Sequence, residues 1–406
     1  MTVTIIITFC FLLLIAYVFD LTSSKTKVPS VILLLLLGWS FRQLSVWFGI
    51  HLPDFSPVLP VLGTIGLILI VLEGSLELEL NKSKFGLIRK SFFGALIPML
   101  ALAFLLAFAF KHFENGGLKA SLINAIPLCV ISSAIAIPSV RNLSKNNKEF
   151  VIYESSLSDI LGVLIFNFLA LNETIDLYSF GHFVFQIFII AVISFIATLG
   201  LSFLLNKIEH NIKFIPIILL VILIYAISKI YHLPGLIFIL LFGLSVGNLD
   251  ELKRFKWVEK LKPDKLEKEV NKFKDLTIEG SFLVRSLFFL LFGYLIETSE
   301  VLNPDTFIWA LSIVFFILIF RIIQLKLSKL PLQALLFIAP RGLITILLFL
   351  SIDATHTISI VNKSLIIQVI IMMAVLMMIG LMTNKSQKND YKPDKSHLQT
   401  KSSTKH

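Results

Sequence analysis

Two acids and three serines lie close together in one stretch of the chain that is otherwise apolar. Glu154 and Asp159 are separated by Ser155, Ser156, Leu157 and Ser158, and an apolar run follows them. Ser155 and Asp159 are four residues apart, which puts them on one face of a helix. An acid inside an apolar segment can hold one proton or one monovalent cation, but not both. This stretch is therefore the first candidate for chemistry.

The chain around these residues has the composition of a membrane protein. Of its 406 residues 56% are hydrophobic and only 15% are charged, whereas a soluble domain carries about a quarter charged residues. Apolar runs recur at the length that crosses a hydrocarbon layer ~30 Å thick at about 1.5 Å per helical residue. The sequence predicts an all-α integral membrane protein with about 13 transmembrane helices. The expected spans are 4–19, 29–44, 57–75, 91–110, 120–140, 150–171, 183–205, 213–229, 233–247, 281–297, 306–326, 332–352 and 364–382.

The distribution of Lys and Arg orients these spans. When the tail after residue 383 is placed in the cytoplasm, the inner segments carry 28 of the 36 basic residues. The outer segments carry five, and the remaining three, Arg285, Arg321 and Arg341, fall inside spans. Because cytoplasmic loops are enriched in Lys and Arg, we expect the N-terminus outside and the C-terminus in the cytoplasm. The expected location is the inner or plasma membrane.

Charges inside a membrane span are costly and usually face a cavity or a charged partner. Counting along the sixth span puts Asp159 ~13 Å deep, near the midplane, and Glu154 only ~6 Å deep. Arg321, counted from the inner end of the eleventh span, lies ~7.5 Å deep, so a buried Glu154–Arg321 pair would neutralise two charges. The alternatives are an interfacial Glu154, an Arg321 that extends to the interface, and an Asp159 held by helix packing. Arg285, close to an inner boundary, is expected to extend toward water.

Two spans carry residues that interrupt a helix. The fifth, 120–140, has prolines on both sides of Ser132 and Ser133, and the twelfth, 332–352, has a proline and a glycine beside Arg341. Proline removes a backbone donor and breaks the hydrogen-bond ladder. Broken helices in corresponding positions of two halves indicate a binding site at the midplane. We therefore expect inverted repeats whose two broken helices cross there, although ordinary proline kinks would account for the same residues.

Taken together, these segments resemble the cation–proton antiporter superfamily, and within it the sodium/proton exchanger branch. Residues 154–159 are similar to that branch's Glu-Ser-Leu-Leu-Asn-Asp signature, with Ser156 and Ser158 in place of a Leu and the Asn. Residues 340–343 resemble the Leu-Arg-Gly segment of its second broken helix, and 320–322 the Arg-bearing helix before it. The resemblance extends from about residue 60 to residue 382 and includes 72–77 and 225–248.

The resemblance implies an antiporter that exchanges a monovalent cation, sodium first and potassium second, for protons. Its site would be Asp159, which binds the cation and the proton in turn, so exchange would be electroneutral, one for one and by alternating access. Hard cations prefer oxygen ligands. Those expected beside Asp159 are Ser158, Ser155, and Ser132 or Ser133.

The resemblance also implies roles for the other buried charges, and it shows one departure. Arg341 is expected to offset partial charges where the broken helix ends meet. Glu154 and Arg321 are expected to hold the sixth and eleventh spans together rather than carry ions. The family's first broken helix usually carries Thr-Asp-Pro, whereas the corresponding place here reads Ser132-Ser133-Ala134. The missing acid leaves hydroxyls and freed carbonyls as ligands, and it bears on cation choice and on transport itself.

The same resemblance implies a scaffold that forms a homodimer and a mobile core, both within residues 1–383. No cofactor and no nucleic-acid partner is expected; the expected partners are monovalent cations, protons, the lipid bilayer and a second copy of the chain. The expected parts are scaffold helices at about 4–75 and 213–297, core helices at about 91–171 and 306–382, a linker helix at 183–205, and a short disordered basic tail in the cytoplasm at 384–406.

Two other classes of protein remain open at this stage. A non-transporting sensor derived from an antiporter would fit the missing acid of the fifth span. A membrane-embedded enzyme would also carry polar residues at depth, but the sequence has no His-Glu metal motif and no Ser-Lys or Ser-His dyad. The sequence therefore favours a transporter over both.

Overall fold

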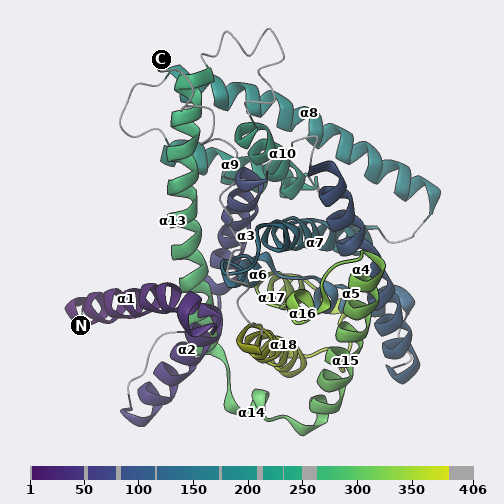
Figure 1. The fold of residues 1–406 in the computed structure, drawn as a ribbon. Coiled ribbons are helices and arrows are strands. Elements are labelled where there is room, and N and C mark those ends of the chain that lie inside the picture. The colour runs from purple at the N-terminus through teal and green to yellow at the C-terminus, as the bar shows by residue number, and fades with distance from the viewer. Residues whose placement is uncertain are drawn as a thin grey trace, which may run out of the picture.

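The computed structural model describes residues 2–49, 54–78, 84–114, 117–172, 176–207, 214–231, 233–248 and 263–383. Within these ranges the chain forms helices joined by turns and loops, and no strand occurs (Figure 1). Nine of the described helices are long and apolar enough to cross a membrane, and three shorter apolar helices accompany them. The predicted all-α membrane fold is confirmed, while the count of 13 spans stays a prediction. The expected tail, 384–406, lies outside the described residues.

Each predicted span overlaps a helix, and the fifth and twelfth each fall on two helices separated by a non-helical stretch. The first half of the chain forms α1 (Thr2–Thr26), α2 (Ser30–Trp47), α3 (Val58–Glu77), α4 (Phe85–Glu114), α5 (Leu118–Cys129), α6 (Ser133–Ser139), α7 (Lys145–Leu171) and α8 (Leu177–Lys207). The second half forms α9 (Phe214–Ile230), α10 (Gly235–Gly247), α13 (Pro263–Leu295), α14 (Thr298–Val301), α15 (Pro304–Leu327), α16 (Leu332–Leu335), α17 (Leu343–Leu350), the 3-10 turn η2 (Ala354–His356) and α18 (Lys363–Thr383).

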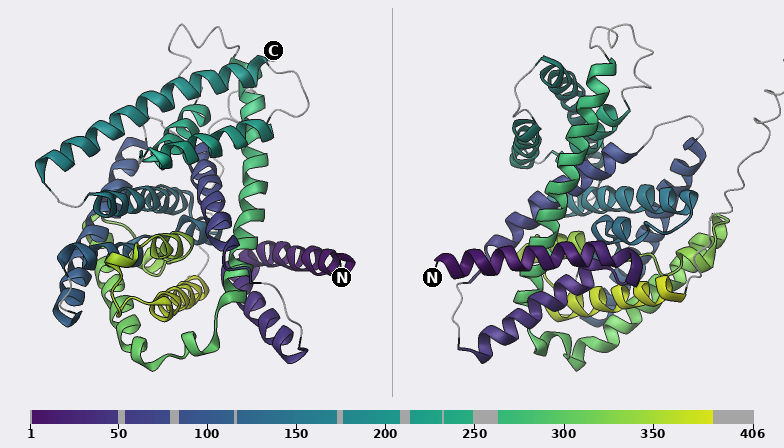
Figure 2. Two further views of the ribbon diagram at one scale, coloured as in Figure 1. Left: turned by 180° about the vertical axis from the view of Figure 1, so that it is seen from behind. Right: turned by 60° about the vertical axis from the view of Figure 1, so that its left-hand side comes forward.

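The helices form two groups that meet at α3. The long helix α13 packs against α2 and α3, and α10 packs between α3 and α8. On the other side, α4 packs against α5, α7 and α15, and α15 packs against α18 (Figure 1). Figure 2 shows α8 along the edge of the molecule and α1 extending away from it. The broken segments α5–α6 and α16–α17 lie inside the second group.

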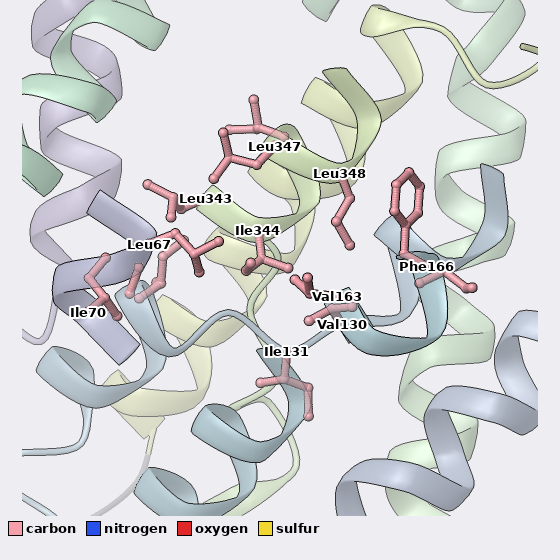
Figure 3. Packing of buried hydrophobic residues seen from close by; sticks show 14 of the residues in the cluster. Leu67, Ile70, Val130, Ile131, Val163, Phe166, Leu343, Ile344, Leu347 and Leu348 are labelled. Atoms are coloured by element: carbon pink, nitrogen blue, oxygen red, sulfur yellow. The ribbon is translucent and has the colours of Figure 1, made fainter. Parts of the chain in front are cut away.

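Apolar side chains from α3, α7, α17 and the stretch between α5 and α6 meet in one core. Burial of such side chains in close contact supplies most of the packing energy between helices that share no polar contact. Figure 3 shows this cluster, with α3 facing α17 and the α5–α6 junction beside them; its labelled members are Leu67, Ile70, Val130, Ile131, Val163, Phe166, Leu343, Ile344, Leu347 and Leu348.

The helix α13 begins well before the predicted tenth span, 281–297. The prediction used hydropathy, which falls before residue 281, but helix formation does not require apolar residues. The charged part of α13 is good helix-forming sequence, and it carries a Lys272–Glu269 pair at 3.6 Å. Phe273 is fully buried, and its ring packs against Phe214 in a tilted arrangement and against Phe242 edge to face. This anchor keeps the extension helical and joined to α9 and α10.

The expectation that Arg285 extends toward water is wrong. Its exposed fraction is only 7%, and its charge interacts with that of Glu73 across the contact between α13 and α3. Counting residues along a helix gives the depth of a side chain but not the direction in which it points. The opposite charge on the neighbouring helix accounts for the burial of Arg285.

Two glycines allow α2 and α13 to approach closely. A Cβ on Gly38 would overlap the Leu290 carbonyl oxygen, and a Cβ on Gly293 would overlap the Leu35 carbonyl oxygen. Backbone atoms cannot move aside as a flexible side chain can. Small residues at such positions let membrane helices pack backbone to backbone.

We expect Gly38→Ala and Gly293→Ala each to destabilise the protein by about 1–3 kcal/mol, because the added methyl forces α2 away from α13. Thermal unfolding of the purified protein in detergent measures this. Gly181→Ala in α8 is the matched control, since nothing lies within 4 Å of a Cβ there. Equal melting temperatures for Gly38→Ala and Gly181→Ala would contradict the assigned contact.

Candidate functional site

The two broken segments cross through their non-helical stretches. Helix α5 ends at Cys129, residues 130–132 are extended, and α6 begins at Ser133. Residues 339–342 form the corresponding stretch before α17. The backbone N–H of Ser132 donates to the carbonyl oxygen of Pro340 at 2.9 Å. A Cβ on Gly342 would lie 2.5 Å from the end of the Ile135 side chain and 3.1 Å from Ser132 Oγ, so the two segments are closely packed here.

Arg341 sits at this crossing and binds backbone carbonyls rather than an acid. Its Nε donates to Leu128 O at 2.8 Å, its Nη2 to Cys129 O at 3.3 Å and its Nη1 to Ala339 O at 2.7 Å. The first two carbonyls belong to the last turn of α5, which is the negative end of that helix dipole. The structure therefore puts the Arg341 charge where the sequence analysis expected it, at a broken helix end.

Asp159 of α7 meets the other side of the same junction. The Ser133 N–H donates to Asp159 Oδ2 at 3.2 Å, and the Ser133 hydroxyl makes a short hydrogen bond to the same oxygen. The second carboxylate oxygen, Oδ1, has no hydrogen-bond partner among the described residues. Asp159 is 2% exposed. The site thus contains a buried acid with one oxygen held in place and one left available.

The other predicted serine ligands lie around this acid but differ in their contacts. Ser132 Oγ is buried without a partner among the described residues. Ser155 Oγ donates to Val151 O at 2.7 Å, so its lone pairs remain free for a ligand. Ser158 Oγ instead accepts the N–H of Ile131 at 2.9 Å. Ser158 therefore satisfies the backbone of the unwound stretch, a contact that spacing along the sequence does not indicate.

The structure brings Glu154 and Arg321 together. Arg321 Nη1 lies 2.5 Å from Glu154 Oε1, and the two side chains are 2% and 1% exposed. The same Arg321 nitrogen donates to Gln324 Oε1 at 2.8 Å, and Gln324 Nε2 makes a short hydrogen bond to Glu154 Oε1. Gln324, one turn beyond Arg321 on α15, was missed by the sequence analysis. Gln324 follows Arg321 by three residues, which puts both on one face of the helix. This spacing could have indicated that Gln324 joins the Glu154–Arg321 pair.

Arg321 also connects α15 to the start of the second broken segment. Its Nε donates to Leu335 O at 3.3 Å and its Nη2 to Ile338 O at 3.0 Å. These carbonyls lie at and just beyond α16, where the helix stops and leaves acceptors unpaired. One guanidinium thus joins α7, α15 and the approach to the crossing.

Crossed broken helices beside a buried acid are the arrangement typical of a binding site in a membrane transporter. The sequence profile of the family described as "Sodium/hydrogen exchanger, transmembrane" matches residues 10–384, and the chain belongs to that family. Cation/proton exchange is the function that this membership supports. The resemblance stated from the sequence is confirmed.

Solved structures agree on the fold. The chain is similar to the structure of the sodium proton antiporter MjNhaP1 from Methanocaldococcus jannaschii at pH 8, with a TM-score of 0.67 and 18% identity over 94% of this chain and 99% of that chain. An electron-microscopy map of the same antiporter gives a TM-score of 0.68 and 18% identity over 93% and 95% of the two chains. No curated protein matches the sequence.

We expect Glu154→Gln and Arg321→Gln each to destabilise the protein by about 3–5 kcal/mol, because each leaves an unpaired buried charge. The double variant should be milder than the sum of the two. Melting temperatures of the four proteins in detergent measure the coupling. The control is the cycle for Lys84 and Glu149, a more exposed pair at 3.1 Å, which should couple by no more than about 1 kcal/mol. Additive losses at the buried pair would contradict its structural role.

Proposed function

We propose that this protein is a secondary active transporter that exchanges one monovalent cation, sodium before potassium, for one proton across the membrane. The observation that supports this most is the state of Asp159. Asp159 is buried at the crossing, and no basic side chain among the described residues forms a salt bridge with it. Glu154, in contrast, forms a salt bridge with Arg321. A buried carboxylate without a fixed counter-charge needs a mobile one. A proton and an alkali cation are the two that fit.

The oxygens available for a cation come from α7 and from the non-helical stretch between α5 and α6. Asp159 Oδ1 and Ser132 Oγ have no hydrogen-bond partner among the described residues, and Ser155 Oγ keeps its lone pairs. Ser133 holds the other carboxylate oxygen and fixes the orientation of Asp159. In this proposal Ser158 positions residues 130–132 through Ile131, and it is not itself a ligand. Sodium, as a hard cation, prefers oxygen ligands of this kind.

Coupling follows from charge. Asp159 can be neutralised by one proton or by one monovalent cation, so each loaded form carries the same charge. Arg321 and Arg341 stay protonated, because guanidinium groups do not lose their proton in proteins. Exchange of one for one then moves no net charge. Ser133 stands where related sequences carry an acid, which removes the group that could carry a second charge.

Alternating access requires movement around the buried site. On one side of the crossing, α3 packs against α17, with Gly63 against Leu347 and Gly66 against Leu343. We infer that α4–α7 and α15–α18 move as a core against a scaffold that includes α2, α3, α10 and α13. The scaffold would form the homodimer, with the C-terminus in the cytoplasm of a cell whose plasma or inner membrane holds the protein. Cross-linking of the purified protein tests whether it forms a dimer. Labelling of the C-terminus from each side of the membrane tests its orientation.

Asp159→Asn is expected to abolish cation-driven proton movement, because the neutral amide neither takes up and releases a proton nor supplies the negative charge that balances a cation. Proteoliposomes loaded with a pH-sensitive dye and given sodium, potassium or lithium in turn measure it. Asp305→Asn, an exposed acid at the start of α15, should exchange like the wild type. Full exchange by folded Asp159→Asn protein would exclude the proposed site. A wild-type protein that moves no protons with any cation would favour the non-transporting sensor.

The rate of sodium-driven pH change should not depend on the membrane potential, because one positive charge moves each way per cycle. The potential is set with a potassium gradient and valinomycin at values on both sides of zero. A proton ionophore added at the end calibrates the full pH change. A reversible dependence of the initial rate on the sign of the potential would show that a second charge moves, and Glu154 would be the first residue to test.

A further inference from the structure

We propose that Ser156 is an additional cation ligand, placed between Asp159 and the N-terminal end of α7, where α7 meets α3. This inference rests on the proposed cation exchange and adds a residue to it. The family signature carries a leucine at this position, so the residue gave no reason to expect a ligand. The inference comes from where the hydroxyl lies.

The Ser156 hydroxyl is buried and unused. The residue is 4% exposed, and Oγ has no hydrogen-bond partner among the described residues. Serines in membrane helices usually donate to a carbonyl one turn earlier, as Ser155 does with Val151. Ser156, next to it on the same helix, does not. A buried hydroxyl without a partner costs free energy unless something binds it.

The hydroxyl lies where Gly74 of α3 has no side chain. A Cβ on Gly74 of α3 would lie 2.9 Å from Ser156 Oγ but 3.8 Å from Ser156 Cβ. The absence of a side chain at Gly74 therefore makes space for Ser156 Oγ, whereas Ser156 Cβ would fit even beside an alanine. Ile137 of α6 is the next nearest group, at 3.9 Å. The oxygen is thus placed on the boundary between α3 and the helices of the crossing.

The position relative to Asp159 makes the oxygen useful. Ser156 and Asp159 are three residues apart on α7, so they are neighbours on one face, about one turn apart. Glu154 Oε1, by contrast, is held by Arg321 and Gln324. Ser156 is therefore a neutral oxygen next to the acid on the side of the lysine-rich N-terminal end of α7. In the proposed site, a cation at Asp159 exchanges part of its hydration for this oxygen.

Removal of the oxygen should weaken cation binding without removing the acid. For Ser156→Ala we expect the half-saturating sodium concentration to rise about threefold to tenfold, the range for one lost neutral polar contact, with an unchanged maximal rate. Ser156→Cys keeps the size but offers a soft sulfur, so it should behave like Ser156→Ala. Ser121→Ala is the matched control, because Ser121 is also a buried serine of this helix group whose Oγ lacks a partner among the described residues.

A second pair of variants tests the glycine. Gly74→Ala should raise the half-saturating concentration as Ser156→Ala does, because its methyl displaces Oγ. Once the oxygen is gone the methyl fits, so Gly74→Ala with Ser156→Ala should be no worse than Ser156→Ala alone. Additive effects in the double variant would mean that Gly74 acts through helix packing, and the assignment of Ser156 would be overturned.

Each protein is measured in two ways, so that failure of the ligand and failure of the exchange are distinguishable. Initial rates in proteoliposomes report transport, and the sodium-dependent rise of the melting temperature in detergent reports binding without transport. Sodium should raise the melting temperature of the wild type, and Ser156→Ala and Ser156→Cys should need more sodium for the same rise. This result would support Ser156 as a cation ligand even if no exchange is measured. If sodium stabilises all three proteins at the same concentration, Ser156 binds no cation and the unpaired hydroxyl holds only a water molecule.

Discussion

The hydrogen bond from Ser132 N to Pro340 O holds the two unwound stretches against each other, and the site depends on it. Backbone groups in a membrane interior must find partners within the protein. Each broken helix leaves such groups unpaired, and each supplies partners for the other. Arg341 donates hydrogen bonds to the carbonyl oxygens of Leu128 and Cys129, which also need partners at the end of α5. Without the crossing, residues 130–132 would not keep their non-helical conformation. Ser133 would then not be held in position to bind Asp159.

Buried charge is compensated in three different ways around this crossing. Glu154 and Arg321 neutralise each other directly at 2.5 Å. Arg341 is balanced by carbonyl dipoles at the end of α5. Asp159 receives only hydrogen bonds from Ser133. The first two arrangements are permanent and rigid, so they suit a structural role. The third leaves a charge to be neutralised from outside, which is the property that a carrier of ions requires.

The sequence predicted which buried charges could meet, but it predicted poorly the direction in which side chains point. Counting residues placed Glu154 and Arg321 at similar depths, and the structure joins them; the prolines marked the two broken spans, and α5–α6 and α16–α17 lie there. The same counting could not show that Ser158 turns to Ile131, or that Arg285 turns inward to α3. Rotation about a helix axis is set by contacts between helices distant in sequence. Hydropathy alone also indicated only the apolar part of α13, because charged residues continue that helix toward its N-terminus.

The replacement of an acid by Ser133 changes what the empty carrier can do. A second carboxylate near Asp159 would repel it, whereas the Ser133 hydroxyl and N–H bind it and hold it in place. In the proposed exchange, Asp159 is neutral when it holds a proton or a cation, and it can then move with the core past the apolar side chains of the scaffold helix α3. Empty, it would carry a bare charge past apolar side chains of α3 such as Leu67 and Ile70, which is costly in an apolar medium. Under the proposed exchange, this cost keeps the empty protein from changing its access and so prevents uncoupled leakage. In the proposed exchange, one well-oriented acid without a fixed counter-charge therefore couples the movement of the two ions.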